Sequence, residues 1–228
     1  MTLKTKLDEV RAEFLRRLSL GDGLLLHQIE DHITARLGKM LRPQLLLASA
    51  ATLGNDALNS RRTLLLAVAV EMLHNASLLH DDVIDHADQR RGQPSVNSRW
   101  GNTAAVLAGD YLLAQVMAIL HEVDDPEAAR RINLTVQTMV EAELIQLETN
   151  AKPLTADTYL KIIDGKTASL FATACALGNP QYEAFGLHYG RLFQLRDDQA
   201  DNETTPFTES LIALEEKTLA SLQEKLAI

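Results

Sequence analysis

Apolar residues recur along most of this chain with the three-to-four-residue spacing that is typical of helices. No segment rises above this pattern as a strand, and the expected helices cover residues 2–19, 24–37, 43–53, 63–86, 102–122, 127–149, 155–163, 166–177, 181–201 and 207–226. Turns that end or separate them are expected at Gly21-Asp22-Gly23, Gly38, Gly54-Asn55, Lys152-Pro153-Leu154-Thr155, Asp164-Gly165 and Gly178-Asn179-Pro180. Because no linker interrupts the pattern, it predicts an all-α protein with a single domain, residues 1–228.

The segment that begins near Thr63 is apolar almost all the way round, so a helix formed there must be buried. It ends in three aspartates, Asp81, Asp82 and Asp85. Residues four apart share one face of a helix, so Asp81 and Asp85 point the same way. The helix is therefore expected to carry carboxylates from the core toward an opening.

Carboxylates at this spacing repel one another and need a counter-charge. A divalent cation with oxygen ligands is a natural one, and Mg²⁺ commonly shares its ligands with substrate phosphates. The alternative is an acidic helix end that is merely solvated. The dipeptide Asp124-Asp125 serves as a comparison, since Pro126 follows and no third carboxylate completes the cluster. We interpret that pair as an exposed loop.

A second cluster near the end of the chain repeats the D-D-x-x-D spacing. Its members, which share one helical face, are Gln194, Asp197, Asp198 and Asp201. Two such clusters in an all-helical chain predict two acidic faces opposed across a cavity. Such an arrangement would suit a polyphosphate bridged by several metal ions.

Composition narrows the class of protein. The net charge of −9 makes a nucleic acid an unexpected partner. The single cysteine, Cys175, excludes an intrachain disulfide and fits a reducing, cytoplasmic location, and its apolar surroundings favour a core position. The N-terminal segment is amphipathic and carries acidic residues, unlike a signal peptide. We expect no membrane span, since the most apolar run, residues 63–80, contains Glu71, His74 and Asn75.

Six short motifs occur in an order that resembles a known family: GKMLRP, HNASLLHDDVID, RRGQPS, GNTAAVLAGDYLLAQ, DGKTASLF and FQLRDDQAD. The chain resembles the trans-polyprenyl diphosphate synthases, and its pattern is most similar to the long-chain, octaprenyl- or solanesyl-like members. The resemblance implies the isoprenoid synthase fold, a helical bundle around a central cavity. It also implies the head-to-tail condensation of isopentenyl diphosphate with an allylic diphosphate, in which Mg²⁺ assists ionisation.

The resemblance assigns roles to individual residues. The implied Mg²⁺ ligands are Asp81, Asp82, Asp85, Asp197, Asp198 and Asp201. The residues implied to contact the allylic diphosphate are Arg90, Lys166, Thr167 and Gln194, and those implied to hold isopentenyl diphosphate are Lys39, Arg42, His74 and Arg91. The residues counted as catalytic are five of the aspartates and one lysine, namely Asp81, Asp82, Asp85, Asp197, Asp198 and Lys166. No protein base is expected, because the released pyrophosphate is thought to take the proton in this family.

The same residues also have simpler interpretations. Lys39 and Arg42 would be ordinary loop cations, and His74 and Gln194 would be hydrogen-bonded core groups. In this interpretation Arg90 and Arg91 would pair with Asp85 and Asp88. The joint pattern of motifs is what favours function.

Two further expectations follow from the resemblance. Small residues at Ala76 and Ser77 leave the product tunnel open, as in relatives with long products, although they would also allow close helix packing. Relatives are homodimers through long central helices, and residues 102–122 are apolar enough to supply such a face.

The chain departs from the family after Asp201. Relatives continue with a lysine-bearing loop, whereas Asn202 stands here in the place of a lysine and the chain ends one helix later. This departure keeps open a non-catalytic or regulatory subunit of a heteromeric synthase. A terpene cyclase is a further alternative, which Lys39, Arg42 and Arg91 disfavour because a cyclase binds only one diphosphate.

Overall fold

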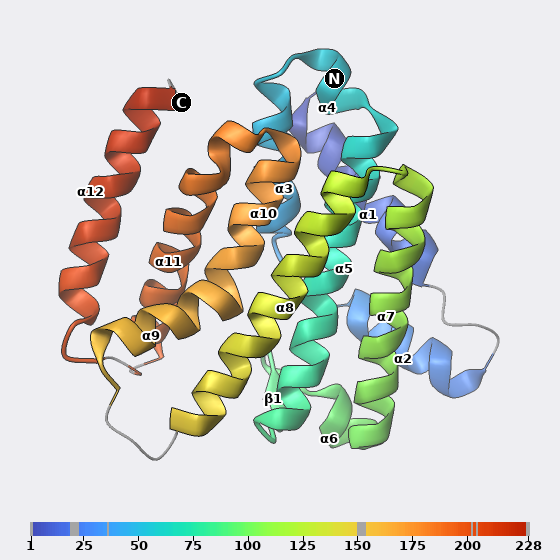
Figure 1. Cartoon of the computed structure of the whole chain (residues 1–228). Coiled ribbons are helices and arrows are strands. Elements are labelled where there is room, and N and C mark those ends of the chain that lie inside the picture. The colour runs from blue at the N-terminus through green and yellow to red at the C-terminus, as the bar shows by residue number, and fades with distance from the viewer. Residues whose placement is uncertain are drawn as a thin grey trace. The chain divides into compact units, whose positions relative to one another are not determined.

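The computed structural model describes residues 2–18, 23–35, 37–149, 154–201, 203 and 205–226, and these are almost entirely helical (Figure 1). The all-α prediction is confirmed. The turns expected at Gly21-Asp22 and Lys152-Pro153, and the position of Asn202, lie outside the described residues. The helices are α1 (Leu3–Leu18), α2 (Leu24–Thr34), α3 (Leu41–Ala51), α4 (Asn55–Asn59), α5 (Arg61–Ile84), α6 (Val96–Trp100), α7 (Asn102–Val123), α8 (Pro126–Thr149), α9 (Ala156–Ile163), η1 (Asp164–Ala168), α10 (Ser169–Gly178), η2 (Pro180–Tyr182), α11 (Glu183–Ala200) and α12 (Thr208–Leu226).

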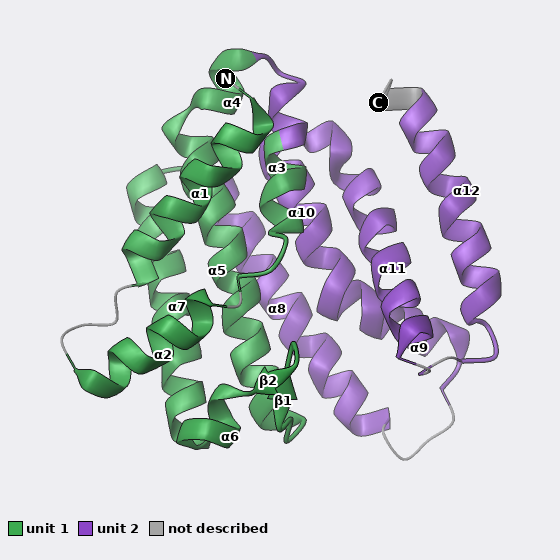
Figure 2. Ribbon diagram, turned by 180° about the vertical axis from the view of Figure 1, so that it is seen from behind, with its two compact units in different colours: residues 1–47, 55–125 green, residues 48–54, 126–228 purple. Residues whose placement is uncertain are grey.

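The contacts within the chain define two compact units (Figure 2). Unit 1 comprises residues 1–47 and 55–125, and unit 2 comprises residues 48–54 and 126–228. Each unit contains one of the two aspartate clusters. The single-domain organisation expected from the sequence stays a prediction.

Unit 1 is built around α5, which packs against α1 and α7. The middle of α5 is buried on every side, and Ala67, Val68 and Ala69 have no exposed surface. Ser60 caps the helix by accepting a hydrogen bond from the backbone N–H of Thr63. The predicted buried helix is thus confirmed, although it ends at Ile84, two residues before the predicted end.

A β-hairpin and a short helix of unit 1 lie between residues 86 and 102, where the sequence predicted no helix or strand. Strands β1 (Gln89–Arg90) and β2 (Gln93–Pro94) form an antiparallel hairpin, so the absence of strands was wrongly predicted. Its two-residue turn has φ values of 52° at Arg91 and 73° at Gly92, as a type I′ turn requires. The short helix α6 follows.

The end of α5 is held closely against α7. The ring of His80 lies where a side chain at Gly109 would be, since a Cβ there would fall 2.3 Å from His80 Nε2. His80 Nε2 also lies 3.2 Å from the carbonyl oxygen of Val106. His80 directly precedes Asp81, so this close packing fixes the position at which the first aspartate cluster begins.

Unit 2 is built around α10, whose residues are almost all buried. Helix α11 approaches it closely through glycines: a Cβ at Gly186 would lie 2.5 Å from the carbonyl oxygen of Phe171. Cys175 is fully buried on this helix, as the sequence predicted.

The break predicted at Asp164-Gly165 is not a break. The chain continues from α9 into α10 through the π-helical segment η1. Gly165 permits close contact with α8, because a Cβ there would lie 2.3 Å from the Cβ of Ala142. π-Helical turns are rare and frequently occur at functional sites.

Within the described part of the chain, the two helices α5 and α7 are long and apolar enough to cross a bilayer by length and composition. In α5, 72% of the most apolar window is buried inside the protein, as in the core helix of a soluble protein; in α7 the figure is 33%. Two such helices are weak evidence of a membrane protein, and the expectation of no membrane span stays a prediction.

Candidate functional site

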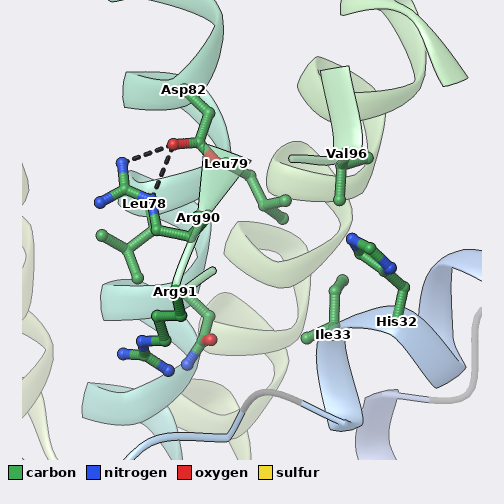
Figure 3. Close-up of a pocket in the computed structure, with 9 residues that line it drawn as sticks. His32, Ile33, Leu78, Leu79, Asp82, Arg90, Arg91 and Val96 are labelled. Carbon is green, nitrogen blue, oxygen red and sulfur yellow. Dashed lines mark hydrogen bonds and ion pairs between the residues drawn. The ribbon is translucent and has the colours of Figure 1, made fainter. Parts of the chain in front are cut away.

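Asp82 ties the first aspartate cluster to the hairpin of unit 1. Its side chain is buried, and Oδ1 accepts hydrogen bonds from Arg90 Nε at 2.8 Å and Arg90 Nη2 at 2.5 Å (Figure 3). The carbonyl oxygen of Asp82 accepts a further hydrogen bond from Asn97 Nδ2 at 3.0 Å. The partner of Arg90 is therefore Asp82, rather than the Asp85 or Asp88 of the simpler interpretation.

The outer members of this cluster are more accessible. Asp81 is partly exposed and Asp85 is exposed at the C-cap of α5, where its N–H donates to the carbonyl oxygen of Asp81 at 2.8 Å. Among the described residues, no three histidine, cysteine, aspartate or glutamate side chains are grouped so that they could hold a metal ion by themselves. This donor set nevertheless fits Mg²⁺, which is commonly bound by one or two carboxylates together with waters and substrate phosphates.

Arg42 lies buried beside Glu71 of α5. Burial lowers the pKa of Arg42 to about 10, the neighbouring Glu71 acts to raise it, and the cation of Arg91 lowers it. Burial raises the pKa of Glu71, against the opposing effect of Arg42 and Arg91. Arg42 therefore remains charged at neutral pH, and unit 1 contains a cationic centre beside the buried carboxyl group of Glu71.

The guanidinium of Arg91 reaches this centre from the hairpin. A Cβ at Gly38 would lie 2.9 Å from both Nη1 and Nη2 of Arg91, so the guanidinium rests against the backbone of the loop that precedes α3. Lys39 follows with an exposed side chain, and Met40 anchors the loop in the core at a φ of 51°. The structure thus brings the GKMLRP and RRGQPS motifs together.

His74 of α5 faces the same cations. Burial, followed by the charges of Arg42, Arg91 and Arg90, lowers the pKa of His74 well below its ordinary value. Judged by its solvent-accessible surface, His74 is only partly buried. A neutral imidazole can accept a hydrogen bond at one nitrogen and donate at the other.

The low pKa of His74 predicts a pH dependence of stability. The unfolded histidine takes up a proton near pH 6.5, whereas the folded one does so only at lower pH, so stability falls as the pH is lowered through 6.5. Between the two pKa values, the free energy of unfolding falls by about 1.4 kcal/mol for each pH unit. Glu71 acts in the opposite direction, because its raised pKa favours the folded state at low pH. Urea unfolding at pH 8 and pH 5.5 should show a smaller loss in His74→Gln than in the unchanged protein; equal losses would contradict the assignment.

A pocket of about 430 Å³, including its open mouth, lies next to this cationic centre (Figure 3). Its walls are apolar on the side of Leu78, Leu79 and Val96, and Arg90 and Arg91 stand at its polar end. The lining residues are His32, Ile33, Asn75, Leu78, Leu79, Asp82, Arg90, Arg91 and Val96. The pocket therefore combines apolar walls with two cationic groups.

The second aspartate cluster is organised around Asp198 of unit 2. Asp198 Oδ2 accepts a hydrogen bond from the hydroxyl of Tyr159, and Oδ1 accepts one from Gln194 Nε2 at 2.6 Å. Gln194 Oε1 in turn accepts from Thr167 Oγ1 at 2.7 Å. Burial and the carboxylate of Asp198 raise the pKa of Tyr159, so the phenol remains a donor. Asp197 and Asp201 are exposed, which repeats the division seen in the first cluster.

Lys166 is held by two side chains of α8. Its Nζ lies 2.5 Å from Glu143 Oε2 and donates to Gln146 Oε1 at 3.0 Å. Sequence reasoning missed Glu143, Gln146 and Tyr159. The only available signal was that Glu143 and Gln146 are three residues apart, and so share a helical face.

The two positions expected to control product length lie on α5. Ala76 is fully buried, and Ser77 is partly buried with its hydroxyl donating to the carbonyl oxygen of His74 at 2.9 Å. The roles of all these side chains, and the opposition of the two aspartate clusters across a cavity, stay predictions.

Comparison with known proteins gives consistent matches. The family model described as polyprenyl synthetase matches residues 24–210. The chain is 36% identical over 78% of its length to an all-trans-nonaprenyl-diphosphate synthase (geranyl-diphosphate specific) of Rhodobacter capsulatus. It is 33% identical over 89% of its length to heptaprenyl diphosphate synthase component 2 of Bacillus subtilis.

A solved structure shares the fold. A polyprenyl synthase from Caulobacter crescentus, complexed with calcium and isoprenyl diphosphate, matches with a TM-score of 0.82 and 32% identity, over 91% of this chain and 65% of that chain. The present chain spans only 57% and 60% of the length of the two curated relatives. Because the family model matches residues 24–210, a range that includes both aspartate clusters, and both curated relatives are more than 30% identical over more than two thirds of this chain, this protein belongs to the polyprenyl synthetase family.

Proposed function

We propose that this protein is a trans-polyprenyl diphosphate synthase, which joins isopentenyl diphosphate to an allylic diphosphate. The observation that carries the proposal is the same in both units: two aspartates that are at least partly exposed occur together with cationic groups suited to phosphate. In unit 1 the cations are Arg42 and Arg91, and in unit 2 the cation is Lys166. Arginine forks and lysine ammonium groups are the usual partners of phosphate oxygens.

The exposed aspartates would hold Mg²⁺ together with the allylic diphosphate: Asp81 and Asp85 in unit 1, Asp197 and Asp201 in unit 2. Cations held there would supply positive charge to offset the negative charge that develops on the leaving group. The inner aspartates have a different role. Asp82 orients Arg90, and Asp198 fixes Gln194, so that these two side chains can address the diphosphate.

The proposed reaction needs no base from the protein. The allylic C–O bond breaks, pyrophosphate leaves, and an allylic cation remains. The alkene of isopentenyl diphosphate attacks this cation to form the new carbon–carbon bond. The resulting cation loses a proton to the released pyrophosphate, which gives the longer diphosphate. Arg42, Arg91 and the exposed Lys39 would hold isopentenyl diphosphate throughout.

Incubation with Mg²⁺, labelled isopentenyl diphosphate and farnesyl diphosphate, with and without cell extract, tests this proposal. We expect prenyl diphosphate products from the pure protein. Products only with extract would favour a subunit of a heteromeric synthase, an alternative that the similarity to a heptaprenyl synthase component supports. Consumption of the allylic diphosphate alone would favour a cyclase.

The product is expected to be longer than farnesyl diphosphate. Neither Ala76 nor Ser77 places a bulky group one turn before Asp81, about 6 Å deeper along α5. Ser77→Phe should shorten the products and leave the first condensation largely intact, while Ser77→Ala, which adds no volume, should leave the lengths unchanged. Chromatography of the dephosphorylated products measures the outcome. An unchanged distribution in Ser77→Phe would show that the tunnel lies elsewhere.

The assembly that we propose is a cytoplasmic homodimer through α7. This helix exposes large apolar side chains, with Val106, Leu107 and Met117 at 38%, 62% and 69% exposure. Apolar surface of this extent on a long helix is typical of a protein interface.

A further inference from the structure

Helix α12 buries a carboxylate in the middle of an apolar stripe. The residues of α12 that face unit 2 recur at helical spacing, and Leu211 and Leu219 are 8% and 7% exposed. Between them Glu215 is only 2% exposed. A buried carboxylate is costly unless it is paired and hydrogen-bonded. Its partners therefore indicate what the helix is held against.

Both partners of Glu215 lie on α11. Oε2 is 2.5 Å from His188 Nδ1, and Oε1 is 3.3 Å from Arg191 Nη1. His188 and Arg191 are three residues apart and so share a face of α11. One buried carboxylate thus joins α12 to two positive or polar groups of its neighbour.

Arg191 extends this connection to η1. Its Nε lies 2.5 Å from Asp164 Oδ1 and its Nη2 lies 2.7 Å from Asp164 Oδ2. This is the two-pronged geometry in which arginine binds a carboxylate most strongly. The hydrogen bonds that Arg191 donates to Asp164, and the charges of Asp164 and Glu215, raise the pKa of Arg191 against its burial, so it is always charged.

Asp164 is the first residue of the π-helical segment, and Lys166 and Thr167 follow it. The segment is also fixed by close contacts on two other sides. A Cβ at Gly165 would meet Ala142 of α8 at 2.3 Å, and one at Gly190 of α11 would meet the Cα of Ala168 at 2.6 Å. Arg191 is therefore the side chain that fixes the entry to η1, at the end where Lys166 and Thr167 are presented.

We propose that Arg191 is a positioning residue for the allylic diphosphate site, and that Glu215 of α12 orients it. The inference rests on the proposed function and names the route by which the C-terminal helix acts on Lys166 and Thr167. Arg191 itself does not contact the substrate in this account. Its loss would allow η1 to shift toward a regular α-helical turn, which would displace both side chains.

The test compares Arg191→Met with Arg131→Met. Arg131 of α8 is a matched control: it is 22% exposed, against 20% for Arg191, and it also reaches α11, through Glu183 at 3.1 Å. Arg191→Met should raise the KM for the allylic diphosphate about tenfold or more, the scale of one charged hydrogen bond. It should change the KM for isopentenyl diphosphate less than about twofold, and Arg131→Met should change neither. Arg191→Lys should recover part of the loss.

A second readout separates this inference from the proposed function. Hydrogen exchange at the backbone amides of residues 165–168 should be about tenfold faster in Arg191→Met, and faster in the milder Glu215→Gln, than in Arg131→Met. This holds whether or not the protein is active. Unchanged exchange in both variants, or equal increases in the two KM values, would overturn the positioning role.

Discussion

Asp197→Ala is expected to lower turnover by about 10²–10³-fold, the scale for losing one electrostatic contact with the transition state. Asp81→Ala should have an effect of the same size. Asp197 is exposed and Asp81 is partly exposed, whereas Asp82 is buried. In the proposed mechanism, each change would remove an oxygen ligand of the cations that neutralise the leaving diphosphate. Steady-state rates with saturating Mg²⁺ measure the effect.

The control is Asp157→Ala. Asp157 is exposed in the first turn of α9, in the same unit as Asp197, and its loss should change turnover less than about twofold. Partial recovery of Asp197→Ala at high Mg²⁺ would agree with weakened cation binding. Undiminished turnover in either cluster variant would rule out the assigned cation sites.

Of the substitutions proposed for this protein, Arg42→Ala should lower the free energy of unfolding most. Arg42 and Glu71 are both buried and influence each other electrostatically. Removing one partner of such a buried pair can cost up to about 3–5 kcal/mol, the scale known for buried ion pairs. Here Glu71 would be left with the less direct compensation of Arg91. The variant should also raise the KM for isopentenyl diphosphate more than that for the allylic partner. Urea unfolding and initial rates measure the two effects.

The pH dependence of this loss identifies its cause. Without Arg42 the pKa of Glu71 rises further, so the folded state keeps its proton to higher pH and stability falls as the pH is raised above 4.5. The destabilisation should therefore be smaller at pH 5 than at pH 8. In Glu71→Gln, which carries no charge at this position, the added change Arg42→Ala should cost much less. An equal cost in both backgrounds would show that Arg42 and Glu71 are not coupled.

The helical elements were predictable where their signal is local. The run from Thr63 is apolar on every side, and the structure buries it as α5. The hairpin was missed because strands of two residues are too short to show alternation. The segment η1 was missed because Gly165 was interpreted as a helix breaker. The structure shows that Gly165 instead allows close contact with Ala142, a residue of another helix.

In the candidate site, too, features with a local sequence signal were predicted and those that depend on distant residues were missed. Spacing placed Asp81 with Asp85, and Asp197 with Asp201, at the ends of α5 and α11, and their roles stay predictions. It did not show that Asp82, next to Asp81, would be buried. The partner of Arg90 was not identified, since the two-residue turn at Arg91 and Gly92 folds the chain back and directs Arg90 to Asp82. Glu143 was missed because its partner, Lys166, lies on a different element. Such pairs form only through tertiary packing, and no local pattern in a single sequence reveals them.

Product stoichiometry in the purified protein tests the central claim most directly. With Mg²⁺, an allylic diphosphate and isopentenyl diphosphate, we expect one pyrophosphate to be released for each isopentenyl unit incorporated. Omission of either substrate, or addition of EDTA in excess over Mg²⁺, should abolish both the release of pyrophosphate and the incorporation of isopentenyl units. Incorporation that persists in EDTA, or pyrophosphate release that does not require isopentenyl diphosphate, would contradict the account.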